Sequence, residues 1–360
     1  MASNLRVGQI VRGGKGIYTI TRKLRDQVGT CYTKGHLTSL SPKHTRNCAT
    51  HDNVVLKCAS QRRLQREKQV SQKFRGHACI RQLIDYAEDP HCLVLEHLQE
   101  DALRSASKAP ISRGNIKIIA RSILFALESL HANGLVHTGD KSFTLDLMNG
   151  ALADLHCKQD IKPDNILLNY DQESTTVLLA DCGDAYEANL TTHPHGAAHA
   201  IGAAIFRSPE ALLGLHWSTS TDVWSFGATV CPPACVVYLT LSLVKLMSLF
   251  WGRGFHIFKP VDGLSADDPE FAAHVLMEQA RYFGPFPLRY NELLDKESES
   301  ILAAIHILIE QQRTRKPFSL VEDEEVLPED KEFLCDVMKL DPLERPTARE
   351  LLQHRWFDVL

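Results

Sequence analysis

The spacing of apolar residues changes along the chain, with the change near residue 98. Before it, short β-branched and aromatic runs predict strands: "GQIVRGGKGIYTITRKL" (8–24) predicts two strands around a Gly-rich turn, and "NVVLKCA" (53–59) and "HCLVLEHL" (91–98) predict two more. "QRRLQREKQVSQKF" (61–74) has helical spacing. The first part of the chain is therefore predicted to be rich in strands.

Helical spacing dominates after residue 98. Apolar residues recur at helical positions over 113–137, and Asn133-Gly134 is a suitable helix C-terminus. "NILLNY" and "TVLLAD" predict a small hairpin, and helical patterns continue from Asp222 to the end. A small β-rich region followed by a larger helical region, with a hinge near 96–100, is the natural division.

Composition narrows the class of protein. Of 360 residues, 44% are hydrophobic and 23% charged, as in globular proteins, and the net charge of -4 gives no general attraction to nucleic acid or anionic membranes. Ten cysteines without metal-type spacing, and no secretory signal, predict a reduced, intracellular protein of the cytoplasm or nucleus. The apolar run 234–251 contains Lys245 and is short for a bilayer, so we interpret it as a buried helix, with a membrane span as the alternative.

Two acidic motifs carry candidate chemistry. "DIKPDNILL" places Asp160, Lys162 and Asn165 on one tight loop that enters a strand. An aspartate there can accept a hydroxyl proton, a lysine can neutralise a phosphoryl group and an asparagine can hold magnesium. Further on, "LLADCGDAYE" supplies Asp181, a plausible second magnesium ligand.

These motifs, in their order, resemble those of the eukaryotic protein kinase family. "VVLKCA" resembles the strand whose lysine, here Lys57, holds ATP phosphates, and Glu67 is the acidic residue of the next helix that could pair with it. "DIKPDN" resembles the catalytic loop, "DCG" the magnesium motif and "SPE" the end of the activation segment. "TDVWSFGA" resembles the helix that braces the catalytic loop through Asp222, and "DPLERPT" supplies an arginine for the glutamate of "SPE", here Arg345 and Glu210.

The resemblance implies an α+β, bilobal protein-kinase-like fold, with a small β-rich N-lobe over 1–98 and a larger helical C-lobe over 99–360. It implies phosphoryl transfer from Mg-ATP to a protein hydroxyl, with catalysis by Asp160 and Lys162 and magnesium held by Asn165 and Asp181. With a lysine two residues after the aspartate, "DIKPDN" resembles the catalytic loop of serine/threonine kinases. Several other stretches resemble fungal SR-protein kinase-like members. Arg/Ser-rich protein substrates follow by analogy.

The same resemblance assigns the nucleotide contacts. Gly14 and Gly16 of "GGKGIYT" would cover the phosphates, although the third glycine position falls near Thr19; a plain hairpin turn is the alternative. Glu96 to Leu98 would read the adenine edge through backbone groups. Lys57, positioned by Glu67, would hold ATP.

Three patternless segments interrupt the motifs, at about 29–47, at 139–159 and at about 230–248. Removing each one restores a continuous kinase-like motif, and the second separates His137 from Asp160. We hypothesise that all three are short introns translated in frame; the alternative is genuine surface insertions. An interrupted catalytic loop makes a pseudokinase or interaction scaffold the competing function.

Overall fold

The computed structural model describes residues 5–27, 30–40, 53–137, 161–171, 174–187, 203–230, 256–260, 264–265, 268–323 and 326–358. The chain divides into two compact units. The first comprises residues 1–99 and 167–185, and the second comprises 100–166 and 186–360. The insertions predicted at 139–159 and about 230–248 lie outside the described residues, apart from Val230.

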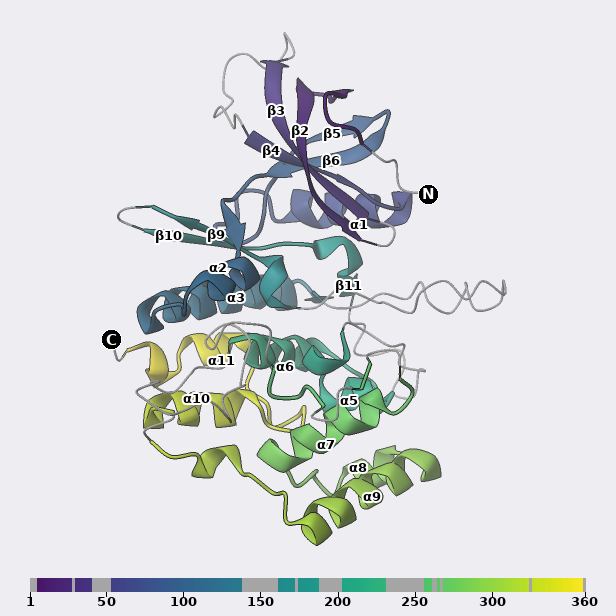
Figure 1. Cartoon of the computed structure of the whole chain (residues 1–360), viewed down its shortest axis with the longest axis vertical. Helices are drawn as coiled ribbons and strands as arrows, with labels where there is room; N and C mark the ends of the chain where they lie inside the picture. Colours follow the sequence, from purple (N-terminus) through teal and green to yellow (C-terminus); the bar gives the residue numbers. More distant parts are fainter. Residues whose placement is uncertain are drawn as a thin grey trace. The chain divides into compact units, whose positions relative to one another are not determined.

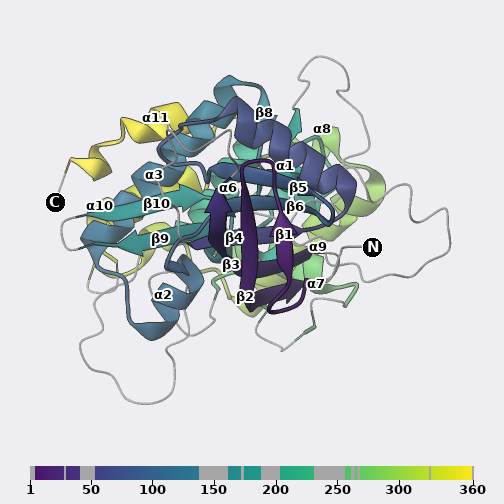
Figure 2. The same cartoon turned by 90° about the horizontal axis from the view of Figure 1, so that it is seen from above.

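The first unit contains a six-stranded sheet, in the order β1-β2-β3-β4-β6-β5 (Figures 1 and 2). Each strand is antiparallel to its neighbours. The strands are β1 Ile10–Arg12, β2 Gly16–Gln27, β3 Thr30–Leu40, β4 Asn53–Cys58, β5 Leu83–Glu88 and β6 His91–Glu96. The two strands predicted around the Gly-rich turn are confirmed as β1 and β2. The strands predicted at 53–59 and 91–98 are confirmed as β4 and β6.

Residues 30–40, inside the insertion expected at about 29–47, form a regular strand and not a patternless segment; that the segment is an insertion stays a prediction. These residues form β3, which pairs with β2 on one side and with β4 on the other. Burial alternates along its first half, with Cys31, Thr33 and Gly35 buried. The buried positions hold small residues rather than Val, Ile or Leu, so the sequence lacks the usual strand signature.

The two faces of this sheet have different roles. One face carries the main apolar core of the unit, which includes Tyr18, Ile20, Val54, Leu56 and Val94. The opposite face includes Leu93 and Leu95, which cluster with Leu64 of helix α1. Because side chains alternate along β4, Lys57 points to this second face, where α1 lies.

Helix α1, Gln61–Lys73, begins after β4 and contacts β5 and β6 (Figure 1). Its predicted helical spacing is confirmed, with Leu64, Glu67, Val70 and Ser71 buried. The neighbouring strands β9 Ile166–Tyr170 and β10 Thr175–Leu179 confirm the expected pairing of "NILLNY" with "TVLLAD". The short helix η3, Cys182–Asp184, follows and contacts α1 closely.

The second unit is mainly helical. Helix α3, Arg113–Ala132, is its long buried helix; Ser112 caps its start and Asn133 its end, before Gly134 at φ 70, as the sequence indicated. The remaining elements are β7 Glu100–Asp101, α2 Ala102–Lys108, β8 Leu135–Val136, η2 Pro163–Asn165, β11 Tyr186–Glu187, η4 Ala204–Phe206, α5 Pro209–Leu212, α6 Thr219–Val230, α7 Phe271–Phe283, α8 Tyr290–Leu293, α9 Lys296–Gln312, η5 Phe318–Leu320, α10 Pro328–Val337, α11 Ala348–Leu352 and η6 Arg355–Phe357.

The predicted fold class is confirmed: a β-rich unit and a helical unit with the elements of a bilobal, α+β, protein-kinase-like fold. Among the described residues, no helix is long and apolar enough to cross a membrane. The apolar run 234–251 lies outside those residues.

Candidate active site

A buried lysine bound to two carboxylates forms the centre of the site in the first unit. The Lys57 ammonium lies 2.5 Å from Glu67 Oε2 and 2.5 Å from Asp181 Oδ1. Lys57 is fully buried, and both acids are less than a tenth exposed. The structure thus brings together three residues that the sequence assigned to nucleotide and metal binding.

Three elements position these side chains. Lys57 comes from β4, whose residues after Asn53 are all buried, and Glu67 comes from the buried face of α1. Asp181 precedes η3 and adopts the left-handed conformation, at φ 66 and ψ 56, which a non-glycine residue rarely adopts. Gly183 lies close to Glu67, since a Cβ there would be 3.4 Å from Glu67 Oε2.

The charges of this centre are not balanced one to one. Burial alone would lower the pKa of the Lys57 ammonium, but the nearby carboxylates of Asp181 and Glu67 together raise it well above its ordinary value. Lys57 is therefore a permanent cation at neutral pH. Two carboxylates share this one ammonium, and carboxylate oxygens are ligands that a hard metal cation such as Mg²⁺ prefers.

Tyr32 of β3 belongs to the same centre, and the sequence analysis missed it. Its hydroxyl donates to Asp181 Oδ2 at 3.1 Å, and the Lys57 ammonium lies 5.4 Å from its ring centroid. Burial, and then the negative charge of Asp181, raise the pKa of the Tyr32 hydroxyl. Tyr32 pairs with Lys57 across the β3–β4 ladder. The strand register would have revealed it, had β3 been predicted.

Arg63 links three parts of the unit and was also missed. Its guanidinium donates to Asp184 Oδ2 at 3.1 Å and to Thr30 Oγ1 at 3.0 Å. Burial alone would lower the pKa of Arg63, but Asp184 and Asp181 raise it. Because Arg63 precedes Glu67 by four positions, both lie on one face of α1. Asp184, the second acid of "DCGD", is the sequence feature that could have indicated a basic partner.

Gly14 and Gly16 are not brought to Lys57. The β2 residue that pairs with Tyr32 is Arg25, and Gly16 lies nine positions before it (25 − 16), about 30 Å along the strand. The amides of this turn are already used, because Lys15 N and Gly16 N donate to Asp85 Oδ2. This placement favours the plain turn over a phosphate cradle. Instead, the end of the β2–β3 pair at Gln27 and Thr30 is the one nearest Lys57 in register.

Glu96 and Leu98 lie at and just after the end of β6. The backbone carbonyl of Glu96 accepts a hydrogen bond from Arg81 Nε at 2.8 Å, and Leu98 is buried. Burial lowers the pKa of Arg81. One of the backbone groups expected to read the adenine edge therefore already has a side-chain partner.

The catalytic-loop residues belong to the second unit. Lys162 precedes η2, and its ammonium lies 3.2 Å from Asp164 Oδ2; Asn165 ends η2 and is buried. Asp160, the predicted catalytic aspartate, lies outside the described residues, so its assignment stays a prediction.

Asp222 of α6 contacts the residues on the N-terminal side of this loop, as its motif indicated. Its Oδ2 accepts from the His137 amide at 2.8 Å and lies 2.9 Å from His131 Nε2. On the same helix, Thr229 Oγ1 donates to the Ile161 carbonyl at 2.6 Å. Helix α6 thus holds the last described residue before the 138–160 segment and the first one after it.

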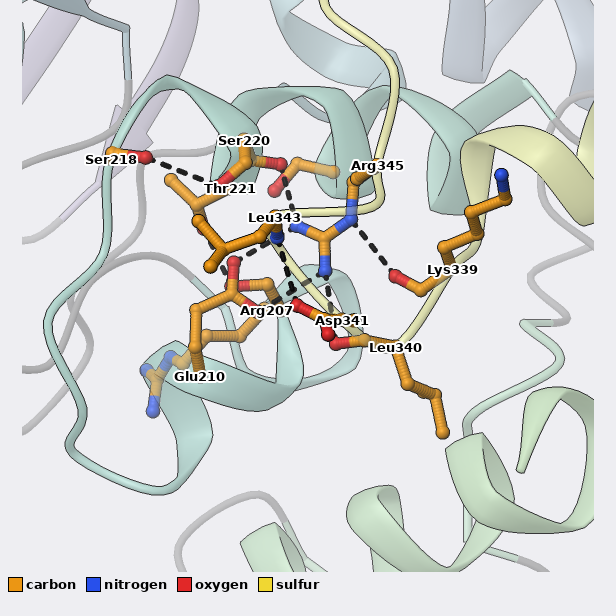
Figure 3. A network of polar contacts seen from close by, with 12 residues as sticks. Arg207, Glu210, Ser218, Ser220, Thr221, Lys339, Leu340, Asp341, Leu343 and Arg345 are labelled. Carbon is orange, nitrogen blue, oxygen red and sulfur yellow. Dashed lines mark hydrogen bonds and ion pairs between the residues drawn. The ribbon is translucent and has the colours of Figure 1, made fainter. Parts of the chain in front are cut away.

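Arg345 and Glu210 form the predicted ion pair, which is confirmed (Figure 3). Two guanidinium nitrogens donate to the two carboxylate oxygens, at 2.9 and 3.2 Å. The other donors reach backbone carbonyls of Lys339, Ser220 and Leu340, so all five N–H groups are used. This pair ties α5 and α6 to the segment after α10.

In comparisons with known proteins, the chain is similar to protein kinases. Residues 140–235 match the protein kinase domain family. The chain is 28% identical over 140 residues to human dual specificity tyrosine-phosphorylation-regulated kinase 3, a match that covers 38% of this chain and 20% of that protein. It is 24% identical over 298 residues to human dual specificity protein kinase CLK1, covering 78% of this chain and 53% of that protein. It is 30% identical over 138 residues to mouse cyclin-dependent kinase 4, a match that covers 38% of this chain and 37% of that protein.

These matches cover part of each protein: the first curated relatives are spanned over about a fifth of their length. Together with the fold, they support the eukaryotic protein kinase family.

Proposed function

We propose, on this support for the eukaryotic protein kinase family, that the chain is an ATP-dependent protein kinase. It transfers the γ-phosphoryl group of Mg-ATP to a hydroxyl group of a protein substrate. The observation that carries the proposal is the buried Lys57, bound at once by Glu67 and Asp181. A lysine held in this way is a fixed positive charge for phosphate oxygens.

The residues fit magnesium and ATP by their chemistry. Mg²⁺ prefers oxygen ligands, and Asp181 and Asn165 offer a carboxylate and an amide oxygen. Bound magnesium would neutralise charge on the phosphates. Lys57 holds the phosphates, Lys162 stabilises the transferred group and Asp160 orients or deprotonates the acceptor hydroxyl. The end of the β2–β3 hairpin takes the phosphate-covering role in place of Gly14 and Gly16.

The acceptor is a serine or threonine, as the lysine of "DIKPDN" suggests. Two of the relatives are named dual specificity kinases, so tyrosine is a further acceptor to test. Arg/Ser-rich proteins remain the proposed substrate class, by resemblance to SR-protein kinase-like members.

A phosphotransfer assay with Mg-ATP tests the proposal. It compares the chain with a version that lacks residues 139–159, on an Arg-Ser-rich peptide and on variants with Thr or Tyr as the only acceptor. We expect transfer that is lost in Asp160→Ala. If the shortened protein alone is active, the segment is foreign to the enzyme; if neither folded protein transfers phosphate, the kinase proposal fails for this substrate class.

A specific observation favours a second candidate, an interaction scaffold with the kinase fold. Both oxygens of Asp181 carry protein hydrogen bonds, one from Lys57 and one from Tyr32. A scaffold would keep these contacts permanently and would bind neither magnesium nor ATP. Isothermal titration with Mg-ATP separates the two candidates, because only the kinase gives saturable heat that Lys57→Met abolishes.

A further inference from the structure

The backbone of Tyr32 is held in the sheet on both sides. It pairs with Arg25 on β2 and with Lys57 on β4, so two ladders fix its position in the sheet. Asp181 is also fixed, because η3 after it contacts α1 and is tied to Arg63 through Asp184. The Tyr32–Asp181 hydrogen bond of 3.1 Å therefore joins two well-positioned groups.

The two oxygens of Asp181 are unequal toward a cation. Lys57 donates to Oδ1 at 2.5 Å, and its positive charge opposes a metal ion on that oxygen. A metal is therefore favoured at Oδ2, which is the oxygen that Tyr32 contacts. Magnesium binds oxygen at about 2.0–2.1 Å and keeps a rigid octahedral shell of further ligands. A phenol hydroxyl that points its proton at Oδ2 competes for that approach.

We infer that Tyr32 competes with magnesium for Asp181 and so sets the magnesium concentration at which the nucleotide site is loaded. This rests on the proposed kinase function. Before metal binds, the Tyr32 hydroxyl satisfies the Asp181 carboxylate; when metal arrives, the hydroxyl must turn away. Tyr32 is thus a positioning residue that acts through Asp181.

The test is a magnesium titration of ATP binding, followed by isothermal calorimetry, on the full chain and on Tyr32→Phe. The substitution removes the hydroxyl and keeps the ring. Since a hydrogen bond to a charged group is lost, we expect half-saturation at roughly tenfold lower magnesium. Tyr32→Leu provides a second variant without the hydroxyl, and the unfolding midpoint of each variant shows that it is folded.

The matched control is Tyr18→Phe. Tyr18 lies on β2 and donates to Asp85 Oδ2 at 2.9 Å, so the same kind of bond is removed away from the metal site. We expect its magnesium dependence to equal that of the unsubstituted chain. Asp181→Asn is then introduced both alone and together with Tyr32→Phe. These two proteins should not differ in the magnesium dependence of ATP binding.

The outcomes separate this inference from the proposed function. If Tyr32→Phe and the unsubstituted chain bind Mg-ATP with the same magnesium dependence, the competition is overturned while nucleotide binding stands. If no folded variant binds Mg-ATP, both the inference and the kinase proposal fail. If Tyr18→Phe shifts the titration as much as Tyr32→Phe, the effect is general to the sheet and the competition is rejected.

Discussion

Lys57 and Arg345 are both buried cations that pair with a glutamate, yet their surroundings differ. Arg345 has one carboxylate, which it binds with two nitrogens, and its remaining N–H groups go to fixed backbone carbonyls. Lys57 is shared by Glu67 and Asp181, and Asp181 also bonds Tyr32. In the first arrangement one carboxylate takes two donors of one cation, whereas in the second one ammonium is shared by two carboxylates.

The difference separates a structural ion pair from a functional one. Every donor of Arg345 is satisfied, so nothing is gained when a ligand arrives. At Lys57, phosphate and magnesium can replace contacts that the protein now makes for itself. The two regions should therefore respond differently to substitution: loss of Arg345 should mainly lower stability, and loss of Lys57 should mainly lower activity.

Arg345→Ala should produce the largest effect, a loss of about 3–5 kcal/mol in the free energy of unfolding, because Glu210 is left as an unpaired buried charge. Urea denaturation measures it. Arg349→Ala is the control, since Arg349 is largely exposed and its pair with Glu128 should be worth at most about 1 kcal/mol. Equal losses for the two arginines would contradict a structural role for the Arg345 pair.

Lys57→Met should lower kcat/KM for phosphotransfer by about 10²–10³-fold, since a fixed charge on the phosphates is lost. Its unfolding midpoint should fall less than that of Arg345→Ala, because Arg63 still interacts with Asp181 and Glu67 and Tyr32 still donates to Asp181. Lys23→Met, an exposed lysine on β2, should change neither quantity. Should Lys57→Met unfold the protein as Arg345→Ala does, the contrast between the two sites is broken.

His256 should make the second unit sensitive to acid. Burial lowers its pKa to about 3, and in the neutral ring Nε2–H donates to the Ala228 carbonyl while Nδ1 accepts from the Phe258 amide. The unfolded chain binds the extra proton first, so stability is full above about pH 6.5 and falls toward pH 3. At pH 5 the loss should be about 2 kcal/mol.

Chemical denaturation at pH 7 and pH 5 measures this slope. His256→Gln keeps a donor and an acceptor but does not titrate there, so its slope should be smaller by that amount. An identical slope in both proteins would assign the acid sensitivity to other groups.

Arg63 and Asp184 should show the smallest effect, a coupling of about 1 kcal/mol, because the Arg63 side chain is about a quarter exposed (23%) and screened by water. A double-mutant cycle with Arg63→Ala and Asp184→Ala, followed by urea denaturation, isolates the pair. Additive effects would mean that the contact contributes nothing measurable.

Short motifs were predictable, and contacts across the sheet were not. Lys57, Asp181, Glu210 and Arg345 lie in runs whose neighbours identify them, so the sequence indicated each one before any geometry. Tyr32 and Asp181 are 149 positions apart, and only the β3–β4 register brings Tyr32 beside Lys57. That register was hidden because β3 was not predicted.

The role of the glycine pattern was hard to predict for a related reason. Glycines show that a turn is permitted but do not show what its amides bind. Here Asp85, far along the chain, takes the amides of Lys15 and Gly16 and also the Tyr18 hydroxyl. A buried carboxylate in β5, beyond two further strands and a helix, could not be linked to the turn from local sequence.

The central position of β3 has a consequence for making the protein. A chain shortened by residues 30–40 would leave β2 and β4 each with a row of unpaired backbone N–H and C=O groups, since β3 now bonds both. Open strand edges recruit other copies of the chain and lead to aggregation. Such a deletion should accumulate as insoluble protein, whereas a spliced-out intron would leave a soluble product. Solubility of the deletion is thus a direct test of whether this segment is encoded by an exon.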